Sequence, residues 1–131
     1  MPPRLEVVVG IIRDAAGRIL INQRRPGTHL EGLWEFPGGK RHAGEGREAA
    51  LARELDEELG IVVVSAEPLL TLCHDYPDRC VELDVWTISK FKGEPLACEN
   101  QVIAWIHPEA MSDVEFLPAD APILAALLRS Q

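Results

Sequence analysis

Three glutamates set close together in one segment are the first residues whose types and spacing suggest chemistry. In GEGREAALARELDEELGI, residues 44–61, Glu54, Glu57 and Glu58 stand at positions i, i+3 and i+4 of a predicted helix. At 3.6 residues per turn they fall within an arc of about 100°. Like charges at this spacing repel, and carboxylates near a helix C-terminus oppose the helix dipole. Their presence therefore indicates a role beyond helix formation.

A solvated helix face with internal salt bridges is the ordinary structural explanation for such a cluster. Arg53 is the only cation close enough to pair along the helix, and it precedes Glu57 in the less favourable i,i+4 order. No lysine lies between Ala43 and Ile61. A divalent cation would supply the missing charge, because Mg²⁺ prefers oxygen ligands from carboxylates, water and substrate phosphates.

The spacing around the cluster resembles a known family signature. Gly39 is followed by five residues and Glu45, then by seven residues and the run RELDEELGI at 53–61. This pattern matches the Nudix box at every fixed position, so the chain resembles a Nudix hydrolase. The resemblance implies a Nudix fold of α+β class, with a mixed β-sheet sandwiched between α-helices.

The resemblance also implies a metal site that bridges a substrate pyrophosphate, with Mg²⁺ or Mn²⁺ as the ion. Arg53 would orient the carboxylates, and Glu54 would help to deprotonate the attacking water. Glu99, which follows the GEP turn, would be a further ligand or base, and its structural alternative is an exposed loop acid. The implied metal ligands are Glu54, Glu57, Glu58, Glu99 and the backbone of Gly38, and the implied catalytic residues are Glu54, Arg53 and Glu99.

Four further segments, EFPGGK, PDR, GEP and PAD, occur in the order seen in MutT-type members of this family. Those enzymes convert nucleoside triphosphates to monophosphate and pyrophosphate and remove 8-oxo-dGTP from the nucleotide pool. Phe36 could equally be plain core, and Arg24 a solvated strand end. The implied nucleotide-binding residues are Arg24, Phe36, Gly39, Arg79 and Asp120.

Asp120 departs from the Asn of the best-studied bacterial pattern. An ionised carboxylate accepts hydrogen bonds but does not donate them. It can accept from the N7–H of 8-oxoguanine or from the amino group of cytosine. Pyrophosphohydrolysis of modified pyrimidine triphosphates such as CTP or dCTP derivatives therefore stays open as an alternative, although the PDR turn favours a purine. ADP-ribose or dinucleoside polyphosphates, and a non-catalytic nucleotide sensor, are weaker alternatives.

The coarse pattern predicts strands, turns and helices that must hold these residues. We expect the first two strands to form a hairpin around DAAG, and a short LWEF strand to stop at Pro37, Gly38 and Gly39. The predicted strands are 5–13, 18–24, 33–36, 65–77, 80–91 and 102–106, and the predicted helical segments are 46–59, 107–111 and 118–129, with Gly60 as a C-terminal cap.

Length and charge limit the remaining possibilities. The 131 residues fit one domain spanning 1–131, with 47% hydrophobic and 26% charged residues. A net charge of −8 argues against binding DNA or RNA along its backbone. The N-terminal apolar run is too short to cross a membrane, so we expect a cytoplasmic protein, as a monomer or weak dimer. Three cysteines without CxxC spacing indicate neither a disulfide framework nor a zinc site.

Overall fold

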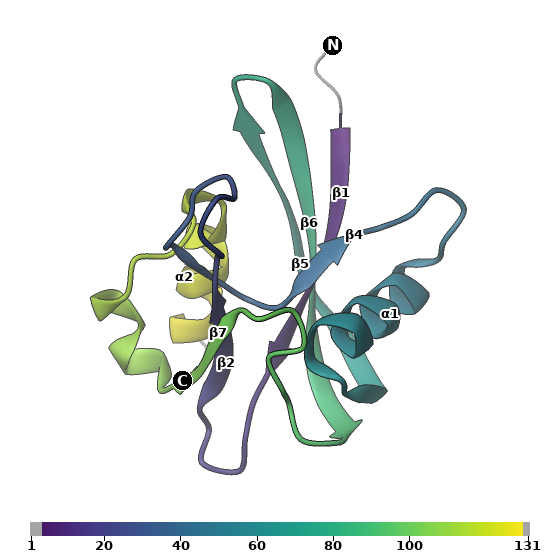
Figure 1. Cartoon of the computed structure of the whole chain (residues 1–131), viewed down its shortest axis with the longest axis vertical. Coiled ribbons are helices and arrows are strands. Elements are labelled where there is room, and N and C mark those ends of the chain that lie inside the picture. Colours follow the sequence, from purple (N-terminus) through teal and green to yellow (C-terminus); the bar gives the residue numbers. More distant parts are fainter. Residues whose placement is uncertain (1–3, 130–131) are drawn as a thin grey trace.

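The computed structural model describes residues 4–129, which form seven strands, two α-helices and two short 3-10 helices. Two sheets occupy the middle of the molecule, with α1 on one side and α2 on the other (Figure 1). This arrangement confirms the predicted fold class. The elements are β1 (Arg4–Ile12), β2 (Ile19–Gln23), β3 (Trp34–Glu35), β4 (Gly38–Lys40), α1 (Arg47–Leu59), β5 (Val62–Tyr76), β6 (Arg79–Lys92), β7 (Val102–Ile106), η1 (Pro108–Asp113), η2 (Pro118–Asp120) and α2 (Ala121–Arg129).

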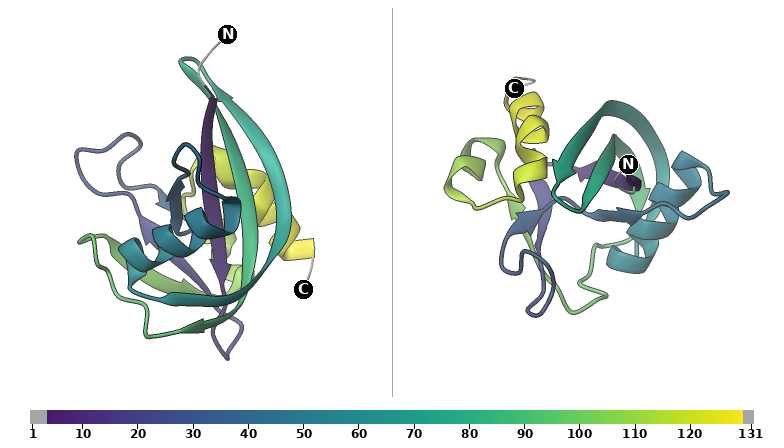
Figure 2. Two further views of the ribbon diagram at one scale, coloured as in Figure 1. Left: turned by 90° about the vertical axis from the view of Figure 1, so that its right-hand side faces the viewer. Right: turned by 90° about the horizontal axis from the view of Figure 1, so that it is seen from above.

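The strands form two separate sheets. One has the order β4-β1-β6-β5 and the other the order β3-β2-β7. β1 runs parallel to β6, and every other pairing is antiparallel. β5 and β6 form a long, strongly curved pair that reaches well beyond α1 (Figure 2). Interrupted register in β5, at Val63, Ser65 and Pro68, accompanies this curvature, as expected for β-bulges.

Alternation along β1 divides the buried side chains into two clusters. Val8 and Ile12 pack with Leu51, Leu55 and Leu59 of α1. The neighbouring residues of β1 face the opposite way, because successive strand side chains point to opposite faces. They join a second cluster that contains α2 and the inner face of β6, namely Val9, Ile11, Val81, Leu83, Ile123 and Leu127.

Helix α1 forms where the sequence predicts it. Gly46 is its N-cap, and Gly60 ends it in the left-handed conformation with φ 70°. The leucines at 51, 55 and 59 are fully buried, whereas Asp56 and Glu57 are exposed. One stripe of the helix thus anchors it to the sheet, and the adjacent stripe carries the acids.

The LWEF strand ends before Pro37 as predicted, because β3 stops at Glu35, but Gly38 and Gly39 begin a further strand that was not predicted. These residues form β4, in which Gly38 pairs with Val9 and Gly39 with Val8 of β1. A Cβ atom on Gly38 would collide with the backbone carbonyl of Val8. The glycines therefore allow a close approach of two backbones, which a reading of glycine as a strand breaker does not anticipate.

The predicted hairpin between the first two strands is also wrong. The chain does turn at residues 14–17, where the Asp14 carboxylate accepts from the backbone N–H of Arg18 at 2.8 Å. Beyond one bridge between Arg13 and Ile19, however, the strands separate into different sheets. β1 pairs with β4 and β6, whereas β2 pairs with β3 and β7 in the other sheet.

The remaining predicted elements are found with small shifts of their ends. β5 begins three residues earlier than expected, and the helical segment from Pro118 consists of η2 followed by α2. The cysteines at 73, 80 and 98 are free thiols. Within residues 4–129, no helix is long and apolar enough to cross a membrane.

Candidate active site

Arg53 organises the acidic side of α1. Its guanidinium binds Glu45 through two bonds of 2.7 and 3.0 Å, and it donates to Glu54 at 2.9 Å and to Glu57 at 3.2 Å. It also donates to the carbonyl of Lys40 at 2.9 Å. The hydrogen bonds from Arg53 lower the pKa of Glu45 to about 2. Glu45 therefore stays ionised and holds Arg53, which in turn fixes two of the three glutamates.

Glu58 is in a different environment from the other two glutamates. Its side chain is 5% exposed, and it accepts one hydrogen bond, of 3.1 Å, from the backbone N–H of Gly38. Burial, together with the nearby charges of Glu35 and Glu99, raises the pKa of Glu58 to about 8. A buried carboxyl surrounded by other carboxyls is costly to ionise unless a cation is bound beside it.

Gly39 lies directly against the Glu54 carboxylate. A Cβ atom at position 39 would collide with all the atoms of that carboxylate group. β4 and α1 are therefore in close contact at this point, and the two glycines bring backbone to both Glu54 and Glu58. The sequence separates these groups by about 15 to 20 residues, and the fold joins them.

The chemistry of these groups fits a hard divalent cation. Carboxylate and carbonyl oxygens are the ligands that Mg²⁺ and Mn²⁺ prefer. In the described part of the chain, no three histidine, cysteine or acidic side chains converge closely enough to form a preformed metal cage. Mg²⁺ often has only one or two protein carboxylates, with waters and substrate phosphates completing its octahedron. Glu58 fits such an ion best, because it is buried and has no ion-pair partner within residues 4–129.

A polar cleft of about 190 Å³ lies beside Glu58. The loop after β6 supplies Gln101, whose amide donates to the Glu58 carbonyl at 3.1 Å and accepts from the Glu99 N–H at 2.9 Å. The fold therefore brings Glu99 to the same cleft as Glu58, although Glu99 is exposed. The cleft is lined by Asn22, Gln23, Arg24, Arg25, Thr28, Glu35, Gly38, Glu58, Glu99 and Gln101.

A larger cavity of about 330 Å³ adjoins this cleft. The two share Arg24, Glu35 and Gly38, so they meet at these residues, and we call the cleft and the cavity together the groove. Most of the larger cavity is apolar, with walls from β1, β6 and the residues around η2. Its lining includes four of the predicted nucleotide-binding residues besides Arg24, namely Phe36, Gly39, Arg79 and Asp120.

Asp120 is the principal buried polar group of the larger cavity. Its side chain is 5% exposed, and Oδ2 has no hydrogen-bond partner among the described residues. Burial, with the charge of Glu35 adding to it, raises the pKa of Asp120 to about 8. The raised pKa favours the neutral carboxyl at pH 7, which can donate through its O–H as well as accept. An ionised Asp120, the state considered from the sequence alone, is not the state that this environment favours.

Phe36 combines the two interpretations left open by the sequence. It is 4% exposed, stacks on Phe116 with ring centroids 5.3 Å apart, and also lines the larger cavity. Arg79, at the tip of the β5–β6 pair, lines the cavity and forms an ion pair with Asp78 at 3.2 Å. Core packing and a cavity wall are thus compatible at position 36.

Arg24 is not a free strand end. It donates to the carbonyl of His29 at 2.6 Å and pairs with Glu35 at 3.4 Å. Glu35 also accepts from the amide of Asn22 at 3.4 Å, and burial raises the pKa of its carboxyl. Arg24 therefore belongs to a partly buried polar network at the junction of the cleft and the cavity.

Sequence reasoning missed Glu35, Tyr76 and Asn22. Glu35 lines both cavities, Tyr76 lines the larger one, and Asn22 is 4% exposed with an unpaired Oδ1 among the described residues. A signal was present for Glu35 and Asn22, because each is a polar residue within an apolar strand segment. Tyr76 had no comparable signal.

Comparisons with known proteins agree with this geometry. Residues 8–126 of the chain match the family model of the NUDIX domain. An Escherichia coli K12 protein named 8-oxo-dGTP diphosphatase is 36% identical over 126 residues, covering 96% of this chain and 98% of that protein. An E. coli K12 protein named CTP pyrophosphohydrolase is 38% identical over 124 residues, covering 95% of this chain and 91% of that protein.

Solved structures show the same fold. A MutT structure from work on Aliivibrio salmonicida and Vibrio cholerae superposes with a TM-score of 0.86 at 32% identity, covering 98% of this chain and 99% of that chain. The chain therefore belongs to the Nudix family, and it is a Nudix hydrolase of the MutT type. Nudix hydrolases typically use a divalent metal, in agreement with the acidic cluster described above.

Proposed function

We propose that the protein is a Mg²⁺-dependent pyrophosphohydrolase that converts 8-oxo-dGTP, or a related oxidised purine nucleotide, to its monophosphate and pyrophosphate. Such an enzyme would clear damaged nucleotides before a polymerase uses them and so limit mutation. The observation that carries the proposal is the buried Asp120 at the wall of an apolar cavity that opens onto the acidic cleft. Relatives named 8-oxo-dGTP diphosphatase support the same substrate.

A neutral Asp120 suits the oxidised base better than normal guanine. In guanine, N7 and O6 are both acceptors. In 8-oxoguanine N7 carries a hydrogen, so that edge presents one donor and one acceptor. A protonated carboxyl offers the complementary pair, with O–H donating to O6 and the carbonyl oxygen accepting from N7–H. In normal guanine, O6 and N7 are both acceptors, and the protonated carboxyl has only one donor. The carbonyl oxygen of Asp120 would then face N7 without a hydrogen bond, which is unfavourable in a buried site.

The phosphates would extend from the cavity into the polar cleft beside α1. Glu54, Glu57, Glu58, Glu99 and the Gly38 backbone are the groups proposed to hold Mg²⁺, or Mn²⁺. When bound, the ion would neutralise phosphate charge and lower the pKa of a bound water. Arg53 would keep Glu54 and Glu57 oriented through its hydrogen bonds, and Glu54, or Glu99, would accept the proton of the attacking water.

A pyrimidine triphosphate is the second candidate substrate. The relative named CTP pyrophosphohydrolase is as similar to this chain as the 8-oxo-dGTP diphosphatases are. A neutral Asp120 could also accept from the cytosine amino group while donating to the adjacent ring nitrogen. The oxidised purine is preferred because several relatives carry that name.

Steady-state kinetics on a nucleotide panel test the proposal. We expect kcat/KM to be highest for 8-oxo-dGTP, with 8-oxo-dGMP and pyrophosphate as products that form only when Mg²⁺ is added. A preference for CTP derivatives would replace the main proposal by the second. A non-catalytic sensor would release no pyrophosphate under any of these conditions. A single domain over 1–131, a cytoplasmic location and a monomer or weak dimer stay predictions.

A further inference from the structure

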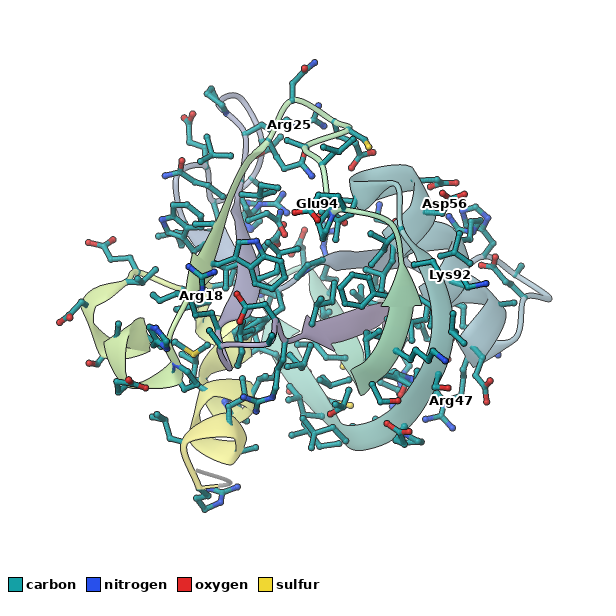
Figure 3. All side chains as sticks on the ribbon, turned by 90° about the horizontal axis from the view of Figure 1, so that it is seen from below. Arg18, Arg25, Arg47, Asp56, Lys92 and Glu94 are labelled. Carbon is teal, nitrogen blue, oxygen red and sulfur yellow. The ribbon has the colours of Figure 1, made fainter. Side chains whose placement is uncertain are left out.

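Arg25 differs from the other arginines that line the groove. Arg24 is paired with Glu35 and Arg79 with Asp78. Within residues 4–129, no carboxylate lies within ion-pair distance of Arg25, and its guanidinium donates to a neutral acceptor, the Glu99 carbonyl, at 3.2 Å. Figure 3 shows Arg25 beside the loop that follows β6, where two loops approach each other. A cation at the wall of an acidic cleft is therefore left without a charged partner.

The position of Arg25 along the groove defines which part of a nucleotide it can reach. Arg24, Glu35 and Gly38 line both the larger cavity and the polar cleft, whereas Arg25 lines only the cleft. A nucleotide with its base beside Asp120 would place its first phosphates near the shared wall. Its last phosphate would lie farthest from the base, in the part of the cleft that contains Arg25.

The charge of the cleft favours a role for this arginine beside the metal ion. The chain has a net charge of −8, and the cleft contains Glu35, Glu58 and Glu99. A triphosphate tail entering this cleft would be repelled unless cations face it. Arginine is well suited to phosphate because its planar guanidinium can donate two parallel hydrogen bonds to phosphate oxygens.

We infer that Arg25 binds the terminal phosphate of a bound nucleoside triphosphate and thereby increases the affinity for triphosphates relative to diphosphates. The inference rests on the proposed function, since it requires a base in the larger cavity. The bond to the Glu99 carbonyl would be exchanged for phosphate oxygens or kept by a different N–H, because guanidinium has five donors. Arg25 would thus distinguish triphosphates from diphosphates, whereas Asp120 would distinguish one base from another.

A purely structural role for Arg25 predicts a different result. Through the Glu99 carbonyl, Arg25 could simply hold the loop after β6 in place. Loss of such a support would weaken every nucleotide alike, because Glu99 faces the same cleft for each of them. The contrast between a triphosphate and a diphosphate of one nucleoside therefore separates the two roles.

Equilibrium binding of uncleavable analogues tests the inference. The α,β-methylene analogues of 8-oxo-dGTP and 8-oxo-dGDP would be titrated calorimetrically, in Mg²⁺, into wild-type protein, Arg25→Gln, Arg25→Lys and the control Arg18→Gln. Arg18 is a matched control because it is an arginine paired with Asp14 outside both cavities. For Arg25→Gln we expect triphosphate affinity to fall about tenfold to a hundredfold and diphosphate affinity to change by no more than about twofold.

Arg25→Lys should lose less triphosphate affinity than Arg25→Gln, since it keeps the charge but not the planar donor pair. Arg18→Gln should bind both analogues as wild type does. Equal weakening of both analogues in Arg25→Gln, or no weakening of either, would overturn the inference. If the wild-type protein bound neither analogue, the proposed function itself would fail, and that result is distinct from either of the other two.

Discussion

The two ends of the groove are built in different ways. At the phosphate end, α1 supplies three glutamates and their organising arginine within six residues, and β4 adds two adjacent glycines. At the base end, the cavity wall is assembled from segments as distant as β1, the β5–β6 tip and η2. The first end is acidic and polar, and the second is largely apolar around the buried Asp120. The groups proposed for catalysis thus come mainly from one short segment of the sequence. The groups proposed to select the base come together only when distant segments fold.

The largest expected effect is at the phosphate end. Glu57→Gln or Glu58→Gln should lower kcat by about a hundredfold or more, because each removes a charge proposed to hold the metal. The fold should survive in both variants. Without metal, the Glu58→Gln protein should melt at a higher temperature than wild type, because the substitution replaces a buried ionisable carboxyl with a neutral amide. Kinetics at saturating Mg²⁺ and thermal melts check both statements. Near-normal turnover in both variants would refute the metal assignment.

The glycines of β4 provide a second test of the phosphate end. Gly39→Ala should reduce kcat/KM by at least about tenfold, since its methyl group would displace the Glu54 carboxylate. Gly46→Ala is the matched control, because a Cβ atom there meets open space. Both variants would be compared in one kinetic assay. Equal activity of Gly39→Ala and the control would show that close contact between β4 and Glu54 is unimportant for turnover.

At the base end, the effect of pH should be moderate and specific. If neutral Asp120 donates to the base, kcat/KM for 8-oxo-dGTP should fall several-fold as pH rises above about 8, where the carboxyl ionises. Asp120→Asn keeps a donor and an acceptor without ionising, so its profile should lack this decline. The pH dependence of kcat/KM for the two proteins measures the difference. Identical profiles would contradict a neutral Asp120.

The smallest expected effect is on stability. Because the pKa of Asp120 is raised in the folded state, to about 8, the folded protein binds more protons than the unfolded chain between about pH 4 and 8. Its contribution to stability is therefore present at low pH and is lost as pH rises towards 8. Asp120→Asn should stabilise the protein at pH 7.5 by on the order of 1–2 kcal/mol. Urea unfolding at pH 5 and 7.5 should show that the free energy of unfolding decreases less with rising pH in the variant than in wild type. The part of the decrease that is due to Glu58 should remain in both proteins. The same decrease of the free energy of unfolding in both proteins would contradict a raised pKa of Asp120.

The same contrast explains what the sequence could predict. The acids of α1, their arginine and the helix ends follow from local spacing, so helix 47–59 and its cap agree closely with the prediction. Pairing between distant strands does not follow from local spacing, and for this reason the hairpin was predicted wrongly and β4 was not predicted.

The protonation of Asp120 is likewise a property of the assembled cavity. Residue 120 could be identified by resemblance, but its burial and the proximity of Glu35 depend on how η2 packs beside β3. From the residue type alone, an ionised carboxylate was the natural assumption. Tyr76 was missed for the same reason, because nothing in its immediate sequence marks it as a cavity-lining residue.

The most direct test of the central claim is the ratio of kcat/KM for 8-oxo-dGTP to that for dGTP, measured in wild-type protein and in Asp120→Ala. Loss of a hydrogen-bonding pair to the base should lower kcat/KM for 8-oxo-dGTP by about tenfold to a hundredfold and leave slow hydrolysis of dGTP nearly unchanged. The ratio should therefore fall by about tenfold to a hundredfold in the variant. If Asp120→Ala lowered both values equally, or left the value for 8-oxo-dGTP intact, Asp120 would not read the base, and the proposed substrate would lose its structural support.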